Sequence, residues 1–246
     1  GGGSMSTARA VREPTEADFT IALPRRLWHM LREGTTTVEV KSGYGLDLQS
    51  ELKMLRAIRA APVHWPGTVD RTALLGHAMD PERRHFVQRT VDETLPAVRD
   101  AFVELTIDAY CEKGAWSVED CVELFEPAIA AGHPIRIHAD QFNSLGMVEW
   151  AADMGPAAVR SVDHLEASSA ATLKRLAKSG VFGVALPCSG FHTDGRYMDA
   201  RTFIDAGGAL AIATNCNPGS WPTHSLPMAI ALAVRHCSLN PAEAIA

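Results

Sequence analysis

Residues 131–141 read A-G-H-P-I-R-I-H-A-D-Q, and this stretch contains the pattern that decides the fold. A Gly turn and Pro134 precede a short apolar run, and His138 lies at its end. Short apolar runs bounded by turn signals are typical of buried β-strands. Three further runs end in polar groups: T-A-L-L-G-H-A (72–78), R-S-V-D-H-L-E (160–166) and A-L-A-I-A-T-N-C-N-P-G-S (209–220). Polar groups that repeat at strand ends indicate one shared rim, where parallel β/α folds place their catalytic sites.

The rest of the chain predicts strands that alternate with amphipathic helices. The expected strands are 36–41, 72–76, 105–111, 135–139, 161–165, 181–186 and 210–214. The expected helices are 16–33, 47–60, 82–102, 117–132, 144–154, 168–179, 198–206 and 224–237, followed by a helical pattern at 240–246. This alternation indicates a parallel sheet with right-handed crossovers.

Capping residues support several of these helices. Asp47 and Asp80 are plausible N-caps, and Ser117 with Asp120 has the spacing of a capping box. Glycines at helix C-termini permit the left-handed backbone that ends a helix. The glycines in such positions are Gly34, Gly132 and Gly180.

Seven strands are one fewer than a closed (β/α)8 barrel needs. The helix expected at 16–33 has no strand before it, and the helical pattern at 240–246 stops at the last residue. We interpret residues 1–246 as one partial barrel domain whose first strand lies outside this sequence. An open, doubly wound sheet of seven strands is the alternative.

Composition excludes several classes of protein. The net charge of −6 offers no basic stripe for nucleic acid. No apolar stretch is long enough to span a membrane, and no signal peptide is visible at the start. The five cysteines have no C-x-x-C pair, which favours reduced, buried thiols and a cytoplasmic protein.

A long, ordered set of motifs resembles imidazolonepropionase, the third enzyme of histidine degradation. These motifs are G-T-T-T-V-E-V-K-S-G-Y-G-L (34–46), E-L-K-M-L-R (51–56), G-H-A (76–78), H-A-D-Q (138–141), S-V-D-H-L-E (161–166), N-P-G-S (217–220) and P-A-E-A (241–244). The resemblance implies a metal-dependent amidohydrolase with a (β/α)8 TIM barrel. Relative to that family, this sequence lacks the first barrel strand with its H-x-H metal pair and the segments of a flanking β-sandwich.

The resemblance also implies roles for individual residues. His138 and Asn215 are expected to bind one divalent metal ion, zinc or iron, and His164 is the expected catalytic residue that activates water. The expected substrate-binding residues are Tyr44, His77, Gln141, Asn217, Gly219 and Ser220. The implied reaction is hydrolysis of the ring C–N bond of 4-imidazolone-5-propanoate, which gives N-formimino-L-glutamate. A homodimer is left open as the assembly.

The polar residues near His138 and His164 have different predicted roles. Consecutive strand residues point to opposite faces, and Asp163 is therefore predicted to point away from His164 and the site. Glu166 is assigned to a loop as a weak candidate, and Asp140 to a structural role. His192 follows the strand expected at 181–186 and is a further candidate for substrate contact.

Asn215 departs from the family, which has Asp at the corresponding position. An amide is neutral, cannot act as a base, and binds a cation more weakly than a carboxylate does. With the H-x-H pair also absent, two other interpretations stay open. One is a related amidohydrolase, such as a deaminase or a cyclic amidase that acts on another heterocycle. The other is a non-catalytic remnant.

Overall fold

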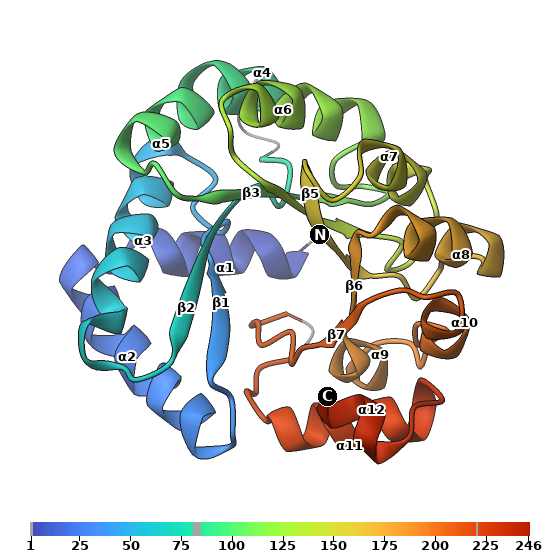
Figure 1. Cartoon of the computed structure of the whole chain (residues 1–246). Coiled ribbons are helices and arrows are strands. Elements are labelled where there is room, and N and C mark those ends of the chain that lie inside the picture. The colour runs from blue at the N-terminus through green and yellow to red at the C-terminus, as the bar shows by residue number, and fades with distance from the viewer. Residues whose placement is uncertain (1, 81–84, 220) are drawn as a thin grey trace. The chain divides into compact units, whose positions relative to one another are not determined.

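The computed structural model describes residues 2–80, 85–219 and 221–246 (Figure 1). The chain divides into two compact units. The first comprises residues 1–110 and 114–134, and the second comprises residues 111–113 and 135–246. Each unit is a parallel sheet with helices, and the predicted description of the whole chain as one domain stays a prediction.

The first unit is built on three parallel strands. These are β1 (Thr37–Lys41), β2 (Thr68–Gly76) and β3 (Thr106–Cys111), which pair in that order. Its helices are α1 (Gly2–Arg12), α2 (Glu16–Arg32), α3 (Leu48–Ala60), η1 (Ala61–His64), α4 (Phe86–Arg89), η2 (Thr90–Thr94), α5 (Leu95–Ala101) and α6 (Val118–Ala130). Leu27 of α2 packs with Val38 of β1 and with Trp65 in an apolar cluster, which fixes α2 beside the sheet.

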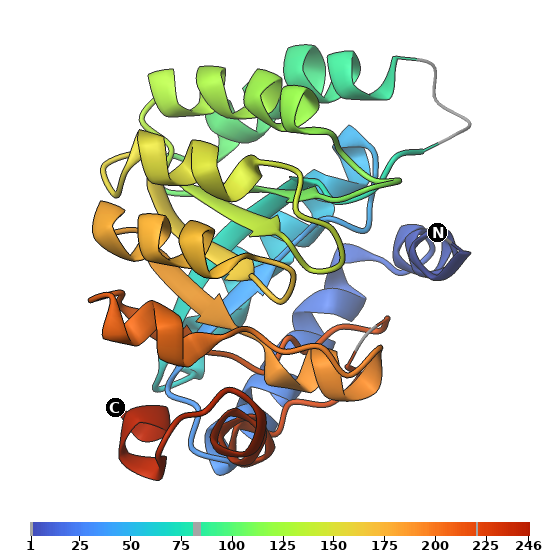
Figure 2. The same ribbon diagram turned by 90° about the vertical axis from the view of Figure 1, so that its right-hand side faces the viewer.

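The second unit has four parallel strands. These are β4 (Ile135–Ala139), β5 (Val159–His164), β6 (Phe182–Ala185) and β7 (Leu210–Ile212), again paired in chain order. Its helices are α7 (Met147–Met154), α8 (Ala170–Ser179), α9 (Pro187–His192), α10 (Ala200–Asp205), α11 (Leu226–His236) and α12 (Pro241–Ile245). Figure 2 shows α7, α8 and α10, in yellow to orange, side by side along one face of this sheet.

Local sequence signals explain where most helices begin and end. Asp47 accepts a hydrogen bond from the N–H of Ser50, and Ser117 and Asp120 form a reciprocal capping box. The predicted helix-ending glycines have the expected left-handed backbone, with φ of 92° at Gly34, 87° at Gly132 and 84° at Gly180.

Asp80 was predicted to cap the helix expected at 82–102, and that assignment stays a prediction. The described helix α4 begins at Phe86, with His85 as its N-cap. The carboxylate of Asp80 is buried and pairs with Arg12 Nη2 at 3.3 Å. Residues 81–84, where the expected helix began, lie outside the described residues.

All seven predicted strands are present in the described part of the chain; β4 has the predicted bounds, and the ends of the other six are shifted. Strand β2 begins at Thr68, four residues before the prediction, and β7 ends at Ile212, two residues early. Helices α1 and α9 were missed. Both contain glycine and serine, which have low helix propensity, and α9 has only six residues.

Four of the five cysteines are buried, as predicted, but Cys216 is exposed. It follows β7, and the loop that contains it carries its side chain out of the sheet. Burial raises the pKa of Cys188 to about 11, which keeps that thiol protonated near neutral pH. Among the described residues, no helix combines the length and hydropathy that crossing a bilayer requires.

Candidate active site

The connection from β1 to α3 presents Tyr44 at the carboxyl end of β1. Gly43 has φ of 122°, a conformation that L side chains rarely adopt. A Cβ atom at Gly43 would lie 2.8 Å from the carbonyl oxygen of Leu74, on the neighbouring strand β2. The chain therefore needs glycine here to turn against β2 and bring Tyr44 toward the end of that strand.

His77 follows β2 directly and contacts this turn. The rings of Tyr44 and His77 pack edge to face, with centroids 4.3 Å apart and planes at 86°. His77 Nδ1 lies 3.2 Å from the carbonyl oxygen of Gly43. A carbonyl only accepts hydrogen bonds, and Nδ1 is therefore the protonated nitrogen in this contact. The two predicted substrate-binding residues of the first unit are thus held together by one short turn.

Tyr44 keeps its hydroxyl proton near neutral pH. Burial raises the pKa of Tyr44 to about 12, because the phenolate would lose hydration. A neutral phenol both donates and accepts hydrogen bonds. The side chain is therefore suited to a ring that has a carbonyl and an N–H close to each other.

An ion pair within the sheet of the first unit was not singled out from the sequence. Asp108 on β3 is fully buried, and its carboxylate lies 2.7 Å from Lys41 Nζ on β1. Lys41 Nζ also lies 3.0 Å from Glu39. The sequence did contain a signal for this ion pair. Every second residue of a strand faces the same side, and V-E-V-K (38–41) and T-I-D-A (106–109) both place charged residues between apolar ones.

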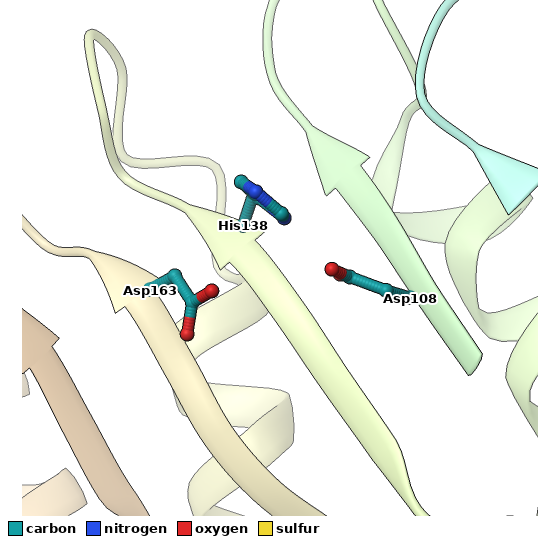
Figure 3. A group of neighbouring side chains, drawn as sticks. All are labelled: Asp108, His138 and Asp163. Atoms are coloured by element: carbon teal, nitrogen blue, oxygen red, sulfur yellow. The ribbon is translucent and has the colours of Figure 1, made fainter. Parts of the chain in front are cut away.

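In the second unit, strand register determines which side chains meet. Strands β4 and β5 pair His138 with Asp163 and Ala139 with His164. Paired residues of parallel neighbours face the same side of the sheet, and a ring nitrogen of His138 and a carboxylate oxygen of Asp163 lie within 4.8 Å of each other. Figure 3 shows these two side chains on adjacent strands. The prediction that Asp163 points away from the site is therefore wrong.

His164 reaches the same region by a different route. It ends β5 with φ of 86°, and Leu165 follows with φ of 70°. This left-handed backbone, uncommon for residues other than glycine, breaks the alternation of the strand. The ring centroids of His164 and His138 lie 5.6 Å apart. Strain of this kind concentrates at functional sites, where the surrounding structure maintains it.

Glu166 is the partner of His164. His164 Nδ1 lies 3.1 Å from Glu166 Oε1, and the two side chains are 3% and 5% exposed. The carboxylate only accepts, and Nδ1 is therefore the donor in this contact, which leaves Nε2 as the ring nitrogen that the contact does not use. Glu166 was predicted to be a weak candidate in a loop, and this prediction is corrected, because the turn at His164 and Leu165 returns the Glu166 side chain to the imidazole.

Gln141 follows β4 on a loop that a buried carboxylate fixes. Gln141 Nε2 donates to Ser189 Oγ at 3.1 Å. Glu112 Oε2 accepts from the N–H groups of Phe142 (2.9 Å) and Asn143 (3.2 Å). Glu112 was missed in the sequence, and its only signal was its position directly after the strand at 106–111. Asp140 has the predicted structural role, because its Oδ2 accepts from Ser168 Oγ at 2.7 Å.

The loop after β7 is held by contacts of its own. Asn217 Oδ1 accepts from the N–H of Gly219 at 2.8 Å, and Asn217 Nδ2 donates to the carbonyl of Asn215 at 2.8 Å. Asn217 also pairs with Trp221 across the turn. Ser220 lies outside the described residues. His192 is exposed on α9 and contacts the Trp221 ring edge-on, with centroids 6.0 Å apart.

The donor atoms of the second unit suit a transition metal. Zinc and iron centres take imidazole nitrogen and carboxylate oxygen ligands. His138 and Asp163 offer one of each at close range. The His164–Glu166 pair beside them has the composition of a general base with an orienting carboxylate. This arrangement is suited to the activation of water.

No family model matches the sequence. The chain is nevertheless similar over its whole length to curated imidazolonepropionases. It is 41% identical over 257 residues to that of Herpetosiphon aurantiacus, 39% over 250 residues to that of Geobacillus kaustophilus, and 41% over 246 residues to that of Deinococcus radiodurans. The alignments cover all of this chain but only 58–60% of the length of these relatives.

Solved structures with the same fold have more distant sequences. Guanine deaminase from C. acetobutylicum matches 96% of this chain and 61% of its own, with a TM-score of 0.71 at 15% identity. An amidohydrolase from Brucella melitensis matches 93% and 57%, with a TM-score of 0.67 at 17% identity. Adenine deaminase from Arthrobacter aurescens matches 96% and 78%, with a TM-score of 0.66 at 15% identity. The predicted α/β-barrel fold class of the amidohydrolases is confirmed.

Proposed function

From the relationship of this chain to the imidazolonepropionases along its entire sequence, we propose that it carries catalytic residues of an imidazolonepropionase. The reaction is hydrolysis of the ring C–N bond of 4-imidazolone-5-propanoate to N-formimino-L-glutamate. The structural observation that supports it best is the His164–Glu166 pair beside His138, at the carboxyl ends of two adjacent parallel strands. Catalytic residues of (β/α) barrels occupy such strand ends.

One divalent ion, zinc or iron, is proposed as the cofactor, and when bound it lowers the pKa of water and polarises a carbonyl. His138 is proposed as a ligand, and Asp163 supplies a carboxylate close to it. Asn215 stays a proposed third ligand through its amide oxygen. Its neutral side chain contributes less to cation affinity than the Asp that the family resemblance implies at this position.

His164 is proposed to move the proton of the attacking water. With Nδ1 directed at Glu166, Nε2 accepts a proton and the carboxylate stabilises the resulting imidazolium. The water oxygen forms a bond with the ring carbonyl carbon, and the bond from that carbon to the ring nitrogen breaks. The departing nitrogen takes back the proton from His164, and the former carbonyl carbon becomes the new carboxylate of the product.

The substrate-binding roles that the family resemblance implies are proposed residue by residue. In the first unit, the neutral hydroxyl of Tyr44 and the imidazole of His77 hydrogen-bond the ring. In the second unit, the amide of Gln141 pairs with adjacent C=O and N–H groups of the ring, since an amide offers both an acceptor and a donor. Asn217, Gly219 and Ser220 hold the propionate tail or the product.

The partner is therefore a small molecule, and a cytoplasmic enzyme of amino-acid degradation is the proposed setting. A homodimer stays a prediction. The five cysteines, without a disulfide between them, suit a reducing compartment.

A substrate panel tests this proposal against its rivals. The protein expressed from its complete gene is incubated with imidazolone propionate, with a cyclic amide such as hydantoin, and with guanine. We expect rapid loss of imidazolone absorbance and little reaction with the other two compounds. Turnover of guanine with ammonia release would identify a deaminase. Inertness of the metal-loaded protein toward all three would support a non-catalytic remnant.

A further inference from the structure

Glu51 is a buried carboxylate that the proposed reaction does not use. It lies in the first turn of α3, and only 3% of it is exposed. It does not cap its own helix, because Asp47 already accepts from the N–H of Ser50. Burying a carboxylate is unfavourable unless it accepts hydrogen bonds, and the partners of Glu51 therefore indicate its role.

Those partners belong to the turn that presents Tyr44. Glu51 Oε1 accepts from the N–H of Gly45 at 2.8 Å and from the N–H of Leu46 at 3.3 Å. On the other side of the same peptide segment, Arg12 Nε donates to the carbonyl oxygen of Gly45 at 3.0 Å. The backbone directly after Tyr44 is thus held from two directions by the side chains of Glu51 and Arg12.

The close approach of this turn to α3 depends on glycine. A Cβ atom at Gly45 would lie 2.9 Å from Glu51 Oε1 and 2.7 Å from the Cβ of Ser50. Leu46 then has φ of 54°, a left-handed conformation that is unfavourable for a leucine. The hydrogen bond from Leu46 N–H to Glu51 offsets part of this strain.

We propose that Glu51 is a positioning residue that fixes residues 42–46 and thereby sets the place of Tyr44 against His77. The chain of contacts runs from Glu51 Oε1 to the amides of Gly45 and Leu46, through the backbone to Tyr44, and from Tyr44 to the His77 ring. This inference rests on the proposed function, in which Tyr44 orients the substrate ring.

The raised pKa of Glu51 shows that burying its carboxylate is unfavourable, and stability of the fold alone does not explain why a carboxylate lies here. Burial raises the pKa of Glu51 to about 7, against the hydrogen bonds that favour its charged form. An apolar side chain of similar size would fill this position without that desolvation. The acceptor atom is therefore what distinguishes Glu51 from an ordinary core residue.

The first test follows Tyr44 by ¹⁹F NMR, independently of activity. The protein from the complete gene is labelled with 3-fluorotyrosine, and the Tyr44→Phe variant assigns the Tyr44 resonance. Glu51→Leu, which removes the acceptor, should shift or broaden that resonance and leave the Tyr197 resonance unchanged. Glu51→Gln, which keeps the Oε1 acceptor, should leave both resonances near their wild-type positions.

The second test measures turnover of imidazolone propionate. Glu51→Leu should reduce kcat/KM by roughly ten- to a hundredfold with normal metal content. Displacement by about 1 Å of a group that orients the substrate is enough to lower the rate by this factor. Glu51→Gln should recover most of the wild-type value. Leu55→Ala is the matched control: Leu55 lies on the same helix and is 1% exposed, and its truncation leaves a cavity but removes no hydrogen bond to the turn.

Gly45→Ala keeps the test decisive if Glu51→Leu does not fold. The added methyl group separates the turn from Glu51 and should reproduce the same loss and the same change at the Tyr44 resonance. A normal Tyr44 resonance and normal kcat/KM in the folded variants would overturn the inference. A wild-type protein that leaves imidazolone propionate intact would instead overturn the proposed function, while the ¹⁹F result would still decide the role of Glu51.

Discussion

At the scale of single residues, His138 is the proposed metal ligand, and its substitution tests metal binding most directly. We predict that His138→Ala lowers metal content by roughly tenfold or more. Loss of a residue that only supports a ligand already lowers metal affinity about tenfold, and loss of the ligand itself should lower it at least as much. The measurement is metal per protein by plasma mass spectrometry. His133→Ala is the control, since its imidazole bonds the carbonyl of Leu105 at 2.8 Å and serves the fold. Equal metal in wild type and His138→Ala would remove His138 from the ligand set.

Glu166 allows a second prediction at this scale. Glu166→Gln replaces a carboxylate with a neutral amide, which stabilises the imidazolium of His164 less well. It should lower kcat roughly ten- to a hundredfold with little change in KM, as expected for general-base catalysis. Steady-state kinetics measure this effect.

The matched control for Glu166 is Glu149→Gln. Glu149 Oε1 accepts from Thr172 Oγ1 at 2.7 Å, in a contact between helices α7 and α8. It is a partly exposed carboxylate of the same unit whose partner is a structural hydroxyl. A loss of kcat as large in Glu149→Gln as in Glu166→Gln would assign both residues to the fold alone.

The sequence identified the right strands at this scale but misjudged two neighbours of His164. Strict alternation along residues 161–166 placed Asp163 and His164 on opposite faces. The left-handed backbone at His164 breaks that alternation, and the register of β4 with β5 brings Asp163 to His138. Neither feature is visible in a single sequence, because register and a strained φ angle are set by tertiary packing.

At the scale of elements, Glu51 makes the packing of α3 against the β1–α3 turn dependent on pH. Its pKa rises from 4.5 to about 7 in the folded protein. The folded state therefore favours the protonated acid, and its stabilising contribution is complete below pH 4.5 and lost as pH rises through about 7. A rise of the carboxyl pKa from 4.5 to about 7 corresponds to about 3 kcal/mol of unfolding free energy.

We predict that Glu51→Gln removes this dependence. Relative to the variant, the wild type should lose about 3 kcal/mol between pH 4.5 and pH 8, measured by urea unfolding. Asp47, Arg89 and Glu93 line the small cavity beside Glu51 and are unchanged in the variant, and the comparison therefore isolates residue 51. Parallel stability curves for the two proteins would show that Glu51 has an ordinary pKa.

Elements were predictable where a local signal is strong. Asp47, Ser117 and Gly180 each mark a helix end through a hydrogen bond or backbone angle encoded within a few residues. Helix α9 has Pro187 in its first turn but no side-chain cap, and the glycine and serine of P-C-S-G-F-H have low helix propensity. Asp80 is a residue type that is common at N-caps, but its carboxylate pairs with Arg12, which lies 68 residues earlier. A contact over that separation has no local sequence signal.

At the scale of the whole molecule, similarity over the entire chain agrees with the predicted fold and with the predicted family of reactions. The chain spans 58–60% of the length of its curated relatives. Because the relatives are longer than this chain, the decisive measurement is made on the protein from its complete gene.

That measurement is the reaction of imidazolone propionate in ¹⁸O-labelled water, with the product identified by mass spectrometry. Ring hydrolysis adds one water molecule, and we predict N-formimino-glutamate with one heavy oxygen in its new carboxylate and no release of ammonia. Removal of metal by a chelator should stop the reaction, and zinc or iron should restore it. An intact imidazolone ring after incubation with the metal-loaded protein, or a product formed with loss of ammonia, would contradict the proposed function.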